Sequence, residues 1–274
     1  HVLSLAQDRA GGIWIGTLAG GASRYDPSDG TWTTYATARV VERGAVMAIH
    51  EARDGTMWFA QEDGIAHIDP VTGEWVPAGL EDYDPSWHRG AMWIAEDSQG
   101  WLWFVDFMDG ASVFDSMAGE WHLPPKGDAG VPYFSQAAVE DATGQVWIGG
   151  DGGAVTSPAG GVEFTPRLEW EVDRIHAGRS GWMWLAGMGM QVSRWMPDTG
   201  VEVPVRVPSD DHPSGWDVVA LHEDVRGDLW VGTLGHGLWR HDPSADAWEN
   251  TGLTGGAFGI SLIHEDRLGR LWVG

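Results

Sequence analysis

The chain has 274 residues, of which 43% are apolar, so it is long enough to bury one large core or two modest ones. Its 16 Lys and Arg against 40 Asp and Glu give a formal net charge of −24, which repels phosphate backbones and anionic lipid surfaces. No apolar run approaches the roughly 20 residues that cross a bilayer, and the first residues given lack the basic and apolar regions of a secretory signal. We therefore expect a soluble domain that contacts neither nucleic acid nor membrane, and the start at His1 indicates a trimmed piece.

Residue counts favour short strands over helices. The 40 Gly and 19 Trp are typical of strands joined by tight turns and anchored by large rings. The absence of Cys excludes disulfides, thiolate metal sites and a cysteine nucleophile. Lys126 is the only lysine, and this bias toward Arg in so acidic a chain indicates either a GC-rich genome or a surface adapted to salt.

One pattern recurs along the whole chain. Its clearest copies begin at Val2 and Val218, and the last copy runs from Ile260 to Gly274. The central Trp of each copy is Trp14, Trp58, Trp103, Trp147, Trp184, Trp230 or Trp272. In chain order, the repeat units span approximately residues 1–36, 45–78, 91–123, 135–166, 171–206, 217–251 and 258–274. We predict that these units form a single domain.

Each full unit predicts four short strands. The first two are of the Val2–Gln7 and Ile13–Thr17 type, and an Asp-x-x-Gly turn joins them. There Asp can accept backbone N–H bonds and Gly can adopt positive φ. The third strand ends in Asp-Pro, as at Asp26, and the fourth carries another Trp, such as Trp32.

A four-stranded antiparallel unit of about 40 to 45 residues, repeated around an axis, is a β-propeller blade. We therefore predict an all-β, seven-bladed propeller. The last unit stops after its second strand, so we expect 26 strands, with the missing two supplied by residues outside the sequence. The spacing of 37 residues between Trp147 and Trp184 makes the fourth blade the shortest, and we expect its outer strand near Val162 to Thr165 to be the least regular.

The pattern in residues Val2 to Asp26 and Val218 to Asp242 resembles the two-component regulator propeller repeat, although units four and five depart from it at Gly150 and at residues 178–190. That resemblance implies a ligand-binding sensor located in the periplasm or outside the cell, ahead of a downstream signalling module. Similar repeats occur in streptogramin lyases and some polysaccharide lyases. The motif is therefore specific for the fold and weak for function.

Residues that break the repeat are the best candidates for binding. Alignment on the turn Asp places Trp93 and Arg174 in a column of the first strands whose other members are small or aliphatic. Long connections between units, which are often functional, add further candidates. The predicted ligand-binding residues at the channel mouth are Trp93, Arg174, Tyr83, Trp87, His88, Arg89, Tyr133 and Phe134. An aromatic platform and a guanidinium there would hold a planar or anionic group of a small molecule or saccharide.

Arg174 and a second column of repeated residues have a structural interpretation as well as a functional one. Arg174 can instead pair with a nearby acid such as Asp173 or Asp106. A second column contains His50, His176, His222 and His264, which we interpret as a repeated hydrogen-bonding device rather than a metal ring, because equivalent atoms of nonadjacent blades are too far apart for one ion. We predict neither a metal nor a cofactor.

No familiar catalytic motif is present, so we predict no catalytic residues. Three classes of function remain open. The first is a noncatalytic sensor, which the resemblance favours. The second is a lyase acting on a cyclic peptide or an acidic polysaccharide, whose acid and base could come from His88, His212, His236 and Tyr133. The third is a protein-interaction scaffold.

Overall fold

The computed structural model describes residues 1–18, 21–35, 45–61, 64–69, 71–78, 91–106, 110–124, 130–187, 191–208, 218–255, 259–265 and 269–274. Its elements are all β-strands, and the described residues include no helix that could cross a membrane. Six sheets have four strands and a seventh has two. This strand content confirms the all-β prediction of a seven-bladed propeller whose last blade is incomplete in the sequence.

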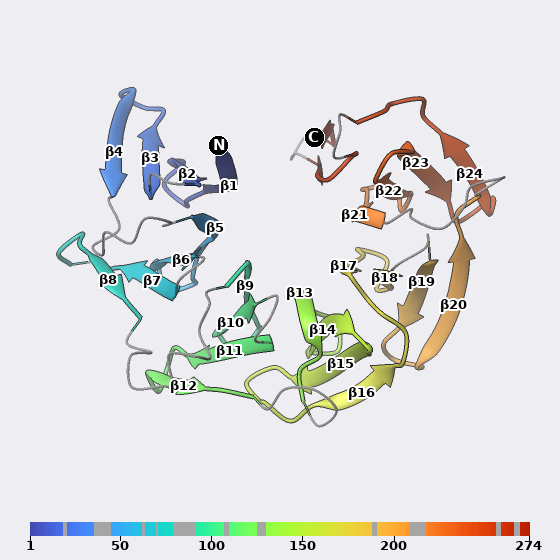
Figure 1. The fold of residues 1–274 in the computed structure, drawn as a ribbon, viewed down its shortest axis with the longest axis horizontal. Coiled ribbons are helices and arrows are strands. Elements are labelled where there is room, and N and C mark those ends of the chain that lie inside the picture. Colours follow the sequence, from blue (N-terminus) through green and yellow to red (C-terminus); the bar gives the residue numbers. More distant parts are fainter. Residues whose placement is uncertain are drawn as a thin grey trace. The chain divides into compact units, whose positions relative to one another are not determined.

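The sheets are numbered here in chain order, and Figure 1 labels their strands. Sheets one to three contain β1 (Val2–Gln7), β2 (Ile13–Thr17), β3 (Ala22–Asp26), β4 (Thr31–Tyr35); β5 (Val46–Glu51), β6 (Met57–Gln61), β7 (Gly64–Ile68), β8 (Trp75–Pro77); and β9 (Trp93–Glu96), β10 (Trp101–Asp106), β11 (Gly110–Asp115), β12 (Glu120–His122). Sheets four and five contain β13 (Tyr133–Glu140), β14 (Gln145–Asp151), β15 (Gly153–Pro158), β16 (Thr165–Leu168); and β17 (Arg174–Ala177), β18 (Met183–Gly187), β19 (Gln191–Met196), β20 (Val201–Arg206). Sheets six and seven contain β21 (Val218–Glu223), β22 (Leu229–Thr233), β23 (Gly237–Asp242), β24 (Ala247–Asn250); and β25 (Ile263–Glu265), β26 (Leu271–Val273).

Neighbouring strands pair in chain order, so each four-stranded sheet is an antiparallel meander. The turn between the first two strands works as the sequence predicts. In sheet three, Asp97 Oδ1 accepts the backbone N–H of Trp101 at 2.9 Å, and Gly100 has a φ of 84°. Asp97 Oδ2 accepts the indole N–H of Trp103 at 3.0 Å, and Trp103 is fully buried. The carboxylate thus closes the turn and satisfies a buried indole at the same time.

Successive sheets pack face to face through the central Trp. In the core between sheets one and two, Trp14 lies 5.4 Å from Phe59, ring centroid to ring centroid, together with Met57 and Ile68. Burying one such ring removes about 150 to 250 Å² from water. At about 25 cal/mol per Å², that contributes roughly 4 to 6 kcal/mol before conformational entropy is subtracted. The repeated Trp is therefore explained by packing alone.

Hydrogen bonds between turns also link successive sheets. Glu51 of sheet two accepts the backbone N–H of Arg9 at 2.6 Å, and the guanidinium of Arg9 donates to Arg53 O at 2.8 Å. Glu96 of sheet three accepts the backbone N–H of Arg53 in the same way, at 3.0 Å. The acid that ends each of these first strands thus holds the turn of the preceding sheet.

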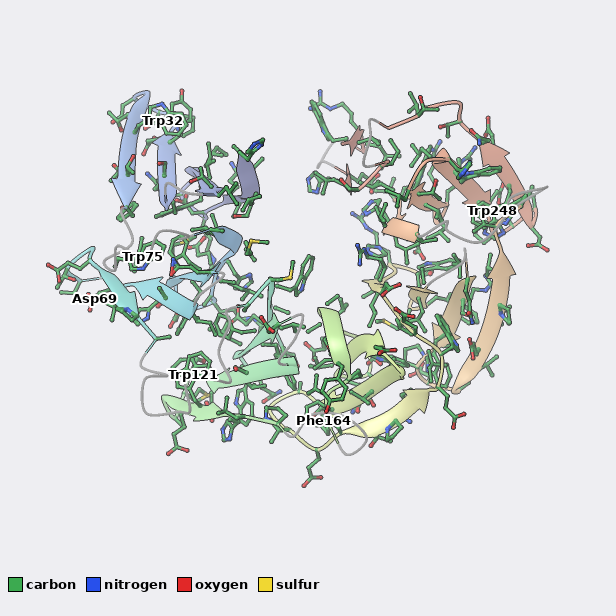
Figure 2. The ribbon with its side chains drawn as sticks, in the orientation of Figure 1. Trp32, Asp69, Trp75, Trp121, Phe164 and Trp248 are labelled. Carbon is green, nitrogen blue, oxygen red and sulfur yellow. The ribbon has the colours of Figure 1, made fainter. Side chains whose placement is uncertain are left out.

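The chain divides into two compact units, residues 1–138 with 159–162, and residues 139–158 with 163–274. In the first unit, β1, β5 and β9 lie side by side, and in the second unit β17 neighbours β21 (Figure 1). The side chains of Figure 2 fill the spaces between neighbouring sheets of each unit. The single domain and its blade limits stay a prediction.

Candidate functional site

Trp93 is an exposed aromatic residue at the start of an inner strand. It begins β9 and pairs with Val105, yet 44% of its surface is exposed. The equivalent residues Ala137 and Ala220 are 7% exposed. Met92, which the sequence analysis did not single out, is also 44% exposed and lies directly before Trp93. Two exposed apolar residues therefore follow one another at this end of the strand.

Arg174 holds two neighbouring first strands together. It begins β17, and its Nε donates to Val219 O of β21 at 2.8 Å. Its Nη1 donates to the backbone carbonyl of Asp173, also at 2.8 Å. The side chain is half-buried. At least part of the guanidinium is therefore engaged in structure, through backbone carbonyls rather than through the carboxylate that the competing interpretation names.

The remaining candidates of the channel mouth are only partly described. Tyr133 begins β13 and is 50% exposed, and Phe134 follows it in the same strand. The other four, Tyr83, Trp87, His88 and Arg89, lie outside the described residues, as does His212. Trp93 and Tyr133 belong to the first compact unit and Arg174 to the second, so a shared site stays a prediction.

The histidine column forms contacts between successive sheets. His50 Nε2 lies 3.3 Å from Glu96 Oε2, and His222 Nε2 lies 3.6 Å from Glu265 Oε2. His176 Nε2 accepts the backbone N–H of Glu223 at 3.0 Å. The contacts of His50 and His176 are hydrogen bonds, as predicted for this column, whereas the longer His222 contact is not one. Among the described residues, no three His, Asp or Glu side chains are grouped closely enough to hold a metal ion.

Burial controls the charge state of this column in the second unit. It lowers the pKa of His176 to about 4, and the positive charge available on nearby His222 acts in the same direction. The opposing attraction of Glu223 is weaker. Burial likewise lowers the pKa of His222, although Glu265 opposes it. His176 is therefore neutral at pH 7, as an acceptor of a backbone N–H must be.

Sheet five replaces the missing turn carboxylate with one from the next sheet. Gly178 occupies the Asp position, and the indole N–H of Trp184 instead donates to Glu223 Oε2 of sheet six at 2.6 Å. Glu223 also accepts from Ser180 N at 2.8 Å and is 1% exposed. The departure at Gly178 is visible in the sequence, but its compensation by Glu223 is not, because the two residues lie 45 positions apart in different repeats.

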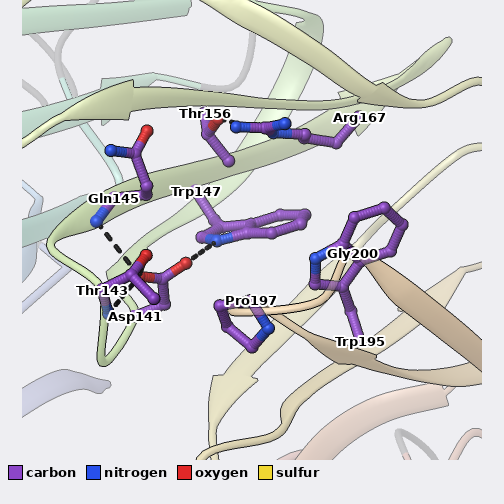
Figure 3. A pocket seen from close by; sticks show the side chains of 9 residues that line it. All are labelled: Asp141, Thr143, Gln145, Trp147, Thr156, Arg167, Trp195, Pro197 and Gly200. Carbon is purple, nitrogen blue, oxygen red and sulfur yellow. Dashed lines mark hydrogen bonds between the residues drawn. The ribbon is translucent and has the colours of Figure 1, made fainter.

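A pocket of about 250 Å³ lies in the second unit, between sheets four and five (Figure 3). One wall is the turn from Asp141 to Gln145 with the edge of Trp147, and the opposite wall is Trp195 with the turn that follows β19. Antiparallel connectivity puts both turns at the end of their sheets opposite the start of β17. The lining residues are Asp141, Thr143, Gln145, Trp147, Thr156, Arg167, Trp195, Pro197 and Gly200.

The comparisons with known proteins agree with the repeat assignment. Residues 1–19 match the family model described as "Two component regulator propeller". This confirms the predicted resemblance for the first repeat. A comparison with curated proteins found no match.

Solved structures share the fold over the whole chain. The extracellular domain of the hybrid two component system BT4673 from B. thetaiotaomicron matches with a TM-score of 0.76 and 20% identity, covering 100% of this chain and 39% of that one. The extracellular domain of BT3049 from the same organism matches with a TM-score of 0.72 and 17% identity, covering 100% and 38%. The present chain thus spans about two fifths of the length of these sensor domains. Both are extracellular, the location that the sequence resemblance implies.

An enzyme has the same fold. Virginiamycin B lyase from Staphylococcus aureus matches with a TM-score of 0.72 and 17% identity, covering 99% of this chain and 90% of that one. Because an extracellular domain of a two component system and a lyase match almost equally well, fold likeness alone does not choose between their functions.

Proposed function

We propose that this chain is the noncatalytic sensor propeller of a two-component-type signalling protein, located in the periplasm or outside the cell, and that it binds a small molecule or saccharide at the channel mouth. A downstream signalling module would read the bound state. The similarity to extracellular sensor domains supports this class. The observation that carries the site is Trp93, a ring left 44% exposed where most equivalent positions hold small or aliphatic side chains.

The residue types suit such a ligand. An exposed indole can stack on the apolar face of a sugar ring, and Tyr133 adds a second exposed ring with a hydroxyl. Binding sites of small molecules combine aromatic walls with a few polar groups. Arg174 would contribute a guanidinium, a group whose N–H donors suit a carboxylate or a pair of sugar hydroxyls.

The test is a screen of neutral and acidic oligosaccharides by thermal shift, followed by calorimetric titration of any hit. We expect Trp93→Ala to weaken binding at least tenfold, because stacking is lost. Trp32→Ala is the matched control, since Trp32 is 58% exposed but lies on the outer strand β4, and it should leave affinity unchanged. Unchanged affinity in both Trp93→Ala and Arg174→Ala would place the site elsewhere.

The lyase remains the second candidate because its structure matches this chain almost completely. Incubation with virginiamycin B and mass spectrometry tests it directly. We expect no conversion. Conversion that is lost in His88→Ala or His212→Ala would replace the sensor proposal with an enzyme. The scaffold alternative predicts neither turnover nor a small ligand, only capture of a protein partner.

A further inference from the structure

The space beside the central Trp is filled in sheets one and six. The residue that pairs with this Trp on the third strand is Arg24 in sheet one and Arg240 in sheet six. Arg24 Nε lies 2.6 Å from Asp8 Oδ2, and Arg240 Nη2 lies 2.6 Å from Asp228 Oδ2. In both sheets an arginine and an acid of the same sheet neutralise each other and occupy the position.

Sheet four leaves the same space open. Thr156 pairs with Trp147 where the other two sheets have arginine, and the pocket of about 250 Å³ occurs at this place. The side chain of Gln145, at the position that Asp228 occupies in sheet six, lines the pocket (Figure 3). Its amide makes no hydrogen bond to any residue that the structure describes. The pocket therefore accompanies a short residue at this position, where sheet two has His67 and sheet three has Val113.

A β-bulge brings a different arginine to this space. Strand β16 pairs Pro166 with Val155 and Leu168 with Ala154, so Arg167 is an extra residue between them. Bulges redirect a side chain and are common beside functional sites. Here Arg167 Nε donates to Thr156 Oγ1 at 2.9 Å, and the side chain extends along the pocket above Trp147 (Figure 3).

The guanidinium of Arg167 is the available charge of the pocket. Its Nη1 and Nη2 have no acceptor among the described side chains and carbonyls, and it forms no ion pair with them. Asp141, the acid of the pocket, is already occupied. Its Oδ1 accepts from Thr143 N at 2.8 Å, Thr143 Oγ1 at 2.6 Å and Gln145 N at 3.1 Å, and its Oδ2 accepts from Trp147 Nε1 at 2.6 Å. Two parallel N–H donors of a guanidinium match a carboxylate.

The net charge of −24 repels any anionic ligand, so the distance over which this repulsion acts determines whether the pocket can bind one. At physiological ionic strength, exposed charges more than about 8 Å away are largely screened. A charge-assisted hydrogen bond acts at contact distance and is stronger than one between neutral groups, although Arg167 itself is exposed. The local guanidinium therefore determines which ligand the pocket prefers.

We propose that this pocket is a second ligand site, separate from the channel mouth, and that it binds a small ring-bearing carboxylate such as a uronic acid. Arg167 holds the carboxylate and the amide of Gln145 contacts a hydroxyl. The half-buried ring of Trp195, which meets Trp147 edge to face at 5.5 Å, contacts the apolar side of the ligand ring. Arg167, Gln145 and Trp195 thus provide the three chemical features of an acidic sugar.

The experiment is calorimetric titration of the full chain with D-glucuronate and, separately, with D-glucose, which has the same ring without the carboxylate. We expect glucuronate to bind and glucose to bind at least tenfold more weakly. Arg167→Gln should reduce glucuronate affinity about tenfold to a hundredfold. Arg226→Gln is the matched control, because Arg226 is an exposed arginine of the same unit whose side chain is 65% exposed, and it should leave affinity unchanged.

A second variant keeps the test valid if Arg167→Gln does not fold. If Arg167→Gln lowers the melting temperature strongly, Gln145→Ala replaces it and should weaken glucuronate binding several-fold. Absence of binding to the unmodified chain, equal affinity for glucose, or equal affinity in Arg167→Gln would each overturn the proposal. Binding that is lost in Trp93→Ala but kept in Arg167→Gln would assign glucuronate to the channel mouth, which overturns the pocket and leaves the sensor proposal standing.

Discussion

Sheets one and four use the same turn and the same buried Trp, but they differ in what lies beside that Trp. In sheet one, Arg24 and Asp8 fill the space with an ion pair. Burial acts to raise the pKa of Asp8, but hydrogen bonds from Arg24 and Trp14 outweigh it and hold the pKa below its usual value. In sheet four, Thr156 leaves a pocket. Side chains that follow the repeat maintain the fold, and departures from it create room for a ligand.

The largest expected effect comes from removing the turn carboxylate. Asp141→Ala takes the acceptor from three backbone or hydroxyl donors and from the indole of Trp147, which is 1% exposed. An unsatisfied buried donor costs about 1 to 3 kcal/mol, so we expect a loss of roughly 2 to 4 kcal/mol. Urea denaturation measures it.

Asp8→Ala in sheet one sharpens the comparison. Trp14 is also nearly buried, at 3% exposed, but the turn of Asp8 is more accessible to water, which can replace some of the lost bonds. We expect a loss about half as large. A loss below about 0.5 kcal/mol for Asp141→Ala would contradict the role assigned to the carboxylate.

Acidification should destabilise the second unit through His176. Its pKa is about 4 in the folded chain and 6.5 in a model peptide, so the unfolded chain binds more protons between these values. The stabilising contribution is therefore complete above pH 6.5 and is lost as the pH falls toward 4, by up to about 3 kcal/mol. His176→Gln, whose side-chain oxygen can still accept the N–H of Glu223, should flatten this dependence. An unchanged melting curve against pH in that variant would show that another group is responsible.

Salt should have the smallest effect on the melting temperature. It acts both on the ion pair of sheet one and on the repulsion that arises from the charge of the whole chain. The Arg24–Asp8 pair is partly exposed and contributes at most about 1 kcal/mol, which salt weakens. Screening also relieves the repulsion of the −24 charge. If the acidity reflects adaptation to salt, the melting temperature should rise by a few degrees between about 0.1 and 2 M KCl. A flat curve would favour genome composition as the origin of the acidity.

The fold could be predicted from the sequence because the residues that interact in each turn recur at the same spacing in most repeats. Each Asp, Gly and Trp of a turn lies within a few residues of its partners, as Asp97 and Trp103 do, so the spacing alone indicates the contact. The column comparison also found Trp93, which is 44% exposed where Ala137 and Ala220 are 7% exposed.

The pocket could not be predicted because its parts come from different strands and sheets. The replacement of arginine by Thr156 was visible in the sequence, but the bulge that redirects Arg167 depends on how β16 pairs with β15. The hydrogen bond from Trp184 to Glu223 of the next sheet is a second contact that the sequence could not predict. The irregularity expected for the outer strand of the fourth unit occurs as this bulge, immediately after the predicted segment ends at Thr165.

Filling the pocket tests most directly whether the open space beside Trp147 is the ligand site. Thr156→Arg restores the arginine of sheet one beside Asp141, as Arg24 lies beside Asp8. We expect the melting temperature to remain within about 3 °C of the unmodified chain, because the new side chain would enter the open pocket and a partly exposed ion pair such as that of sheet one contributes at most about 1 kcal/mol. Glucuronate binding, measured by the same calorimetric titration, should be abolished. Undiminished glucuronate affinity in a folded Thr156→Arg variant would contradict the account.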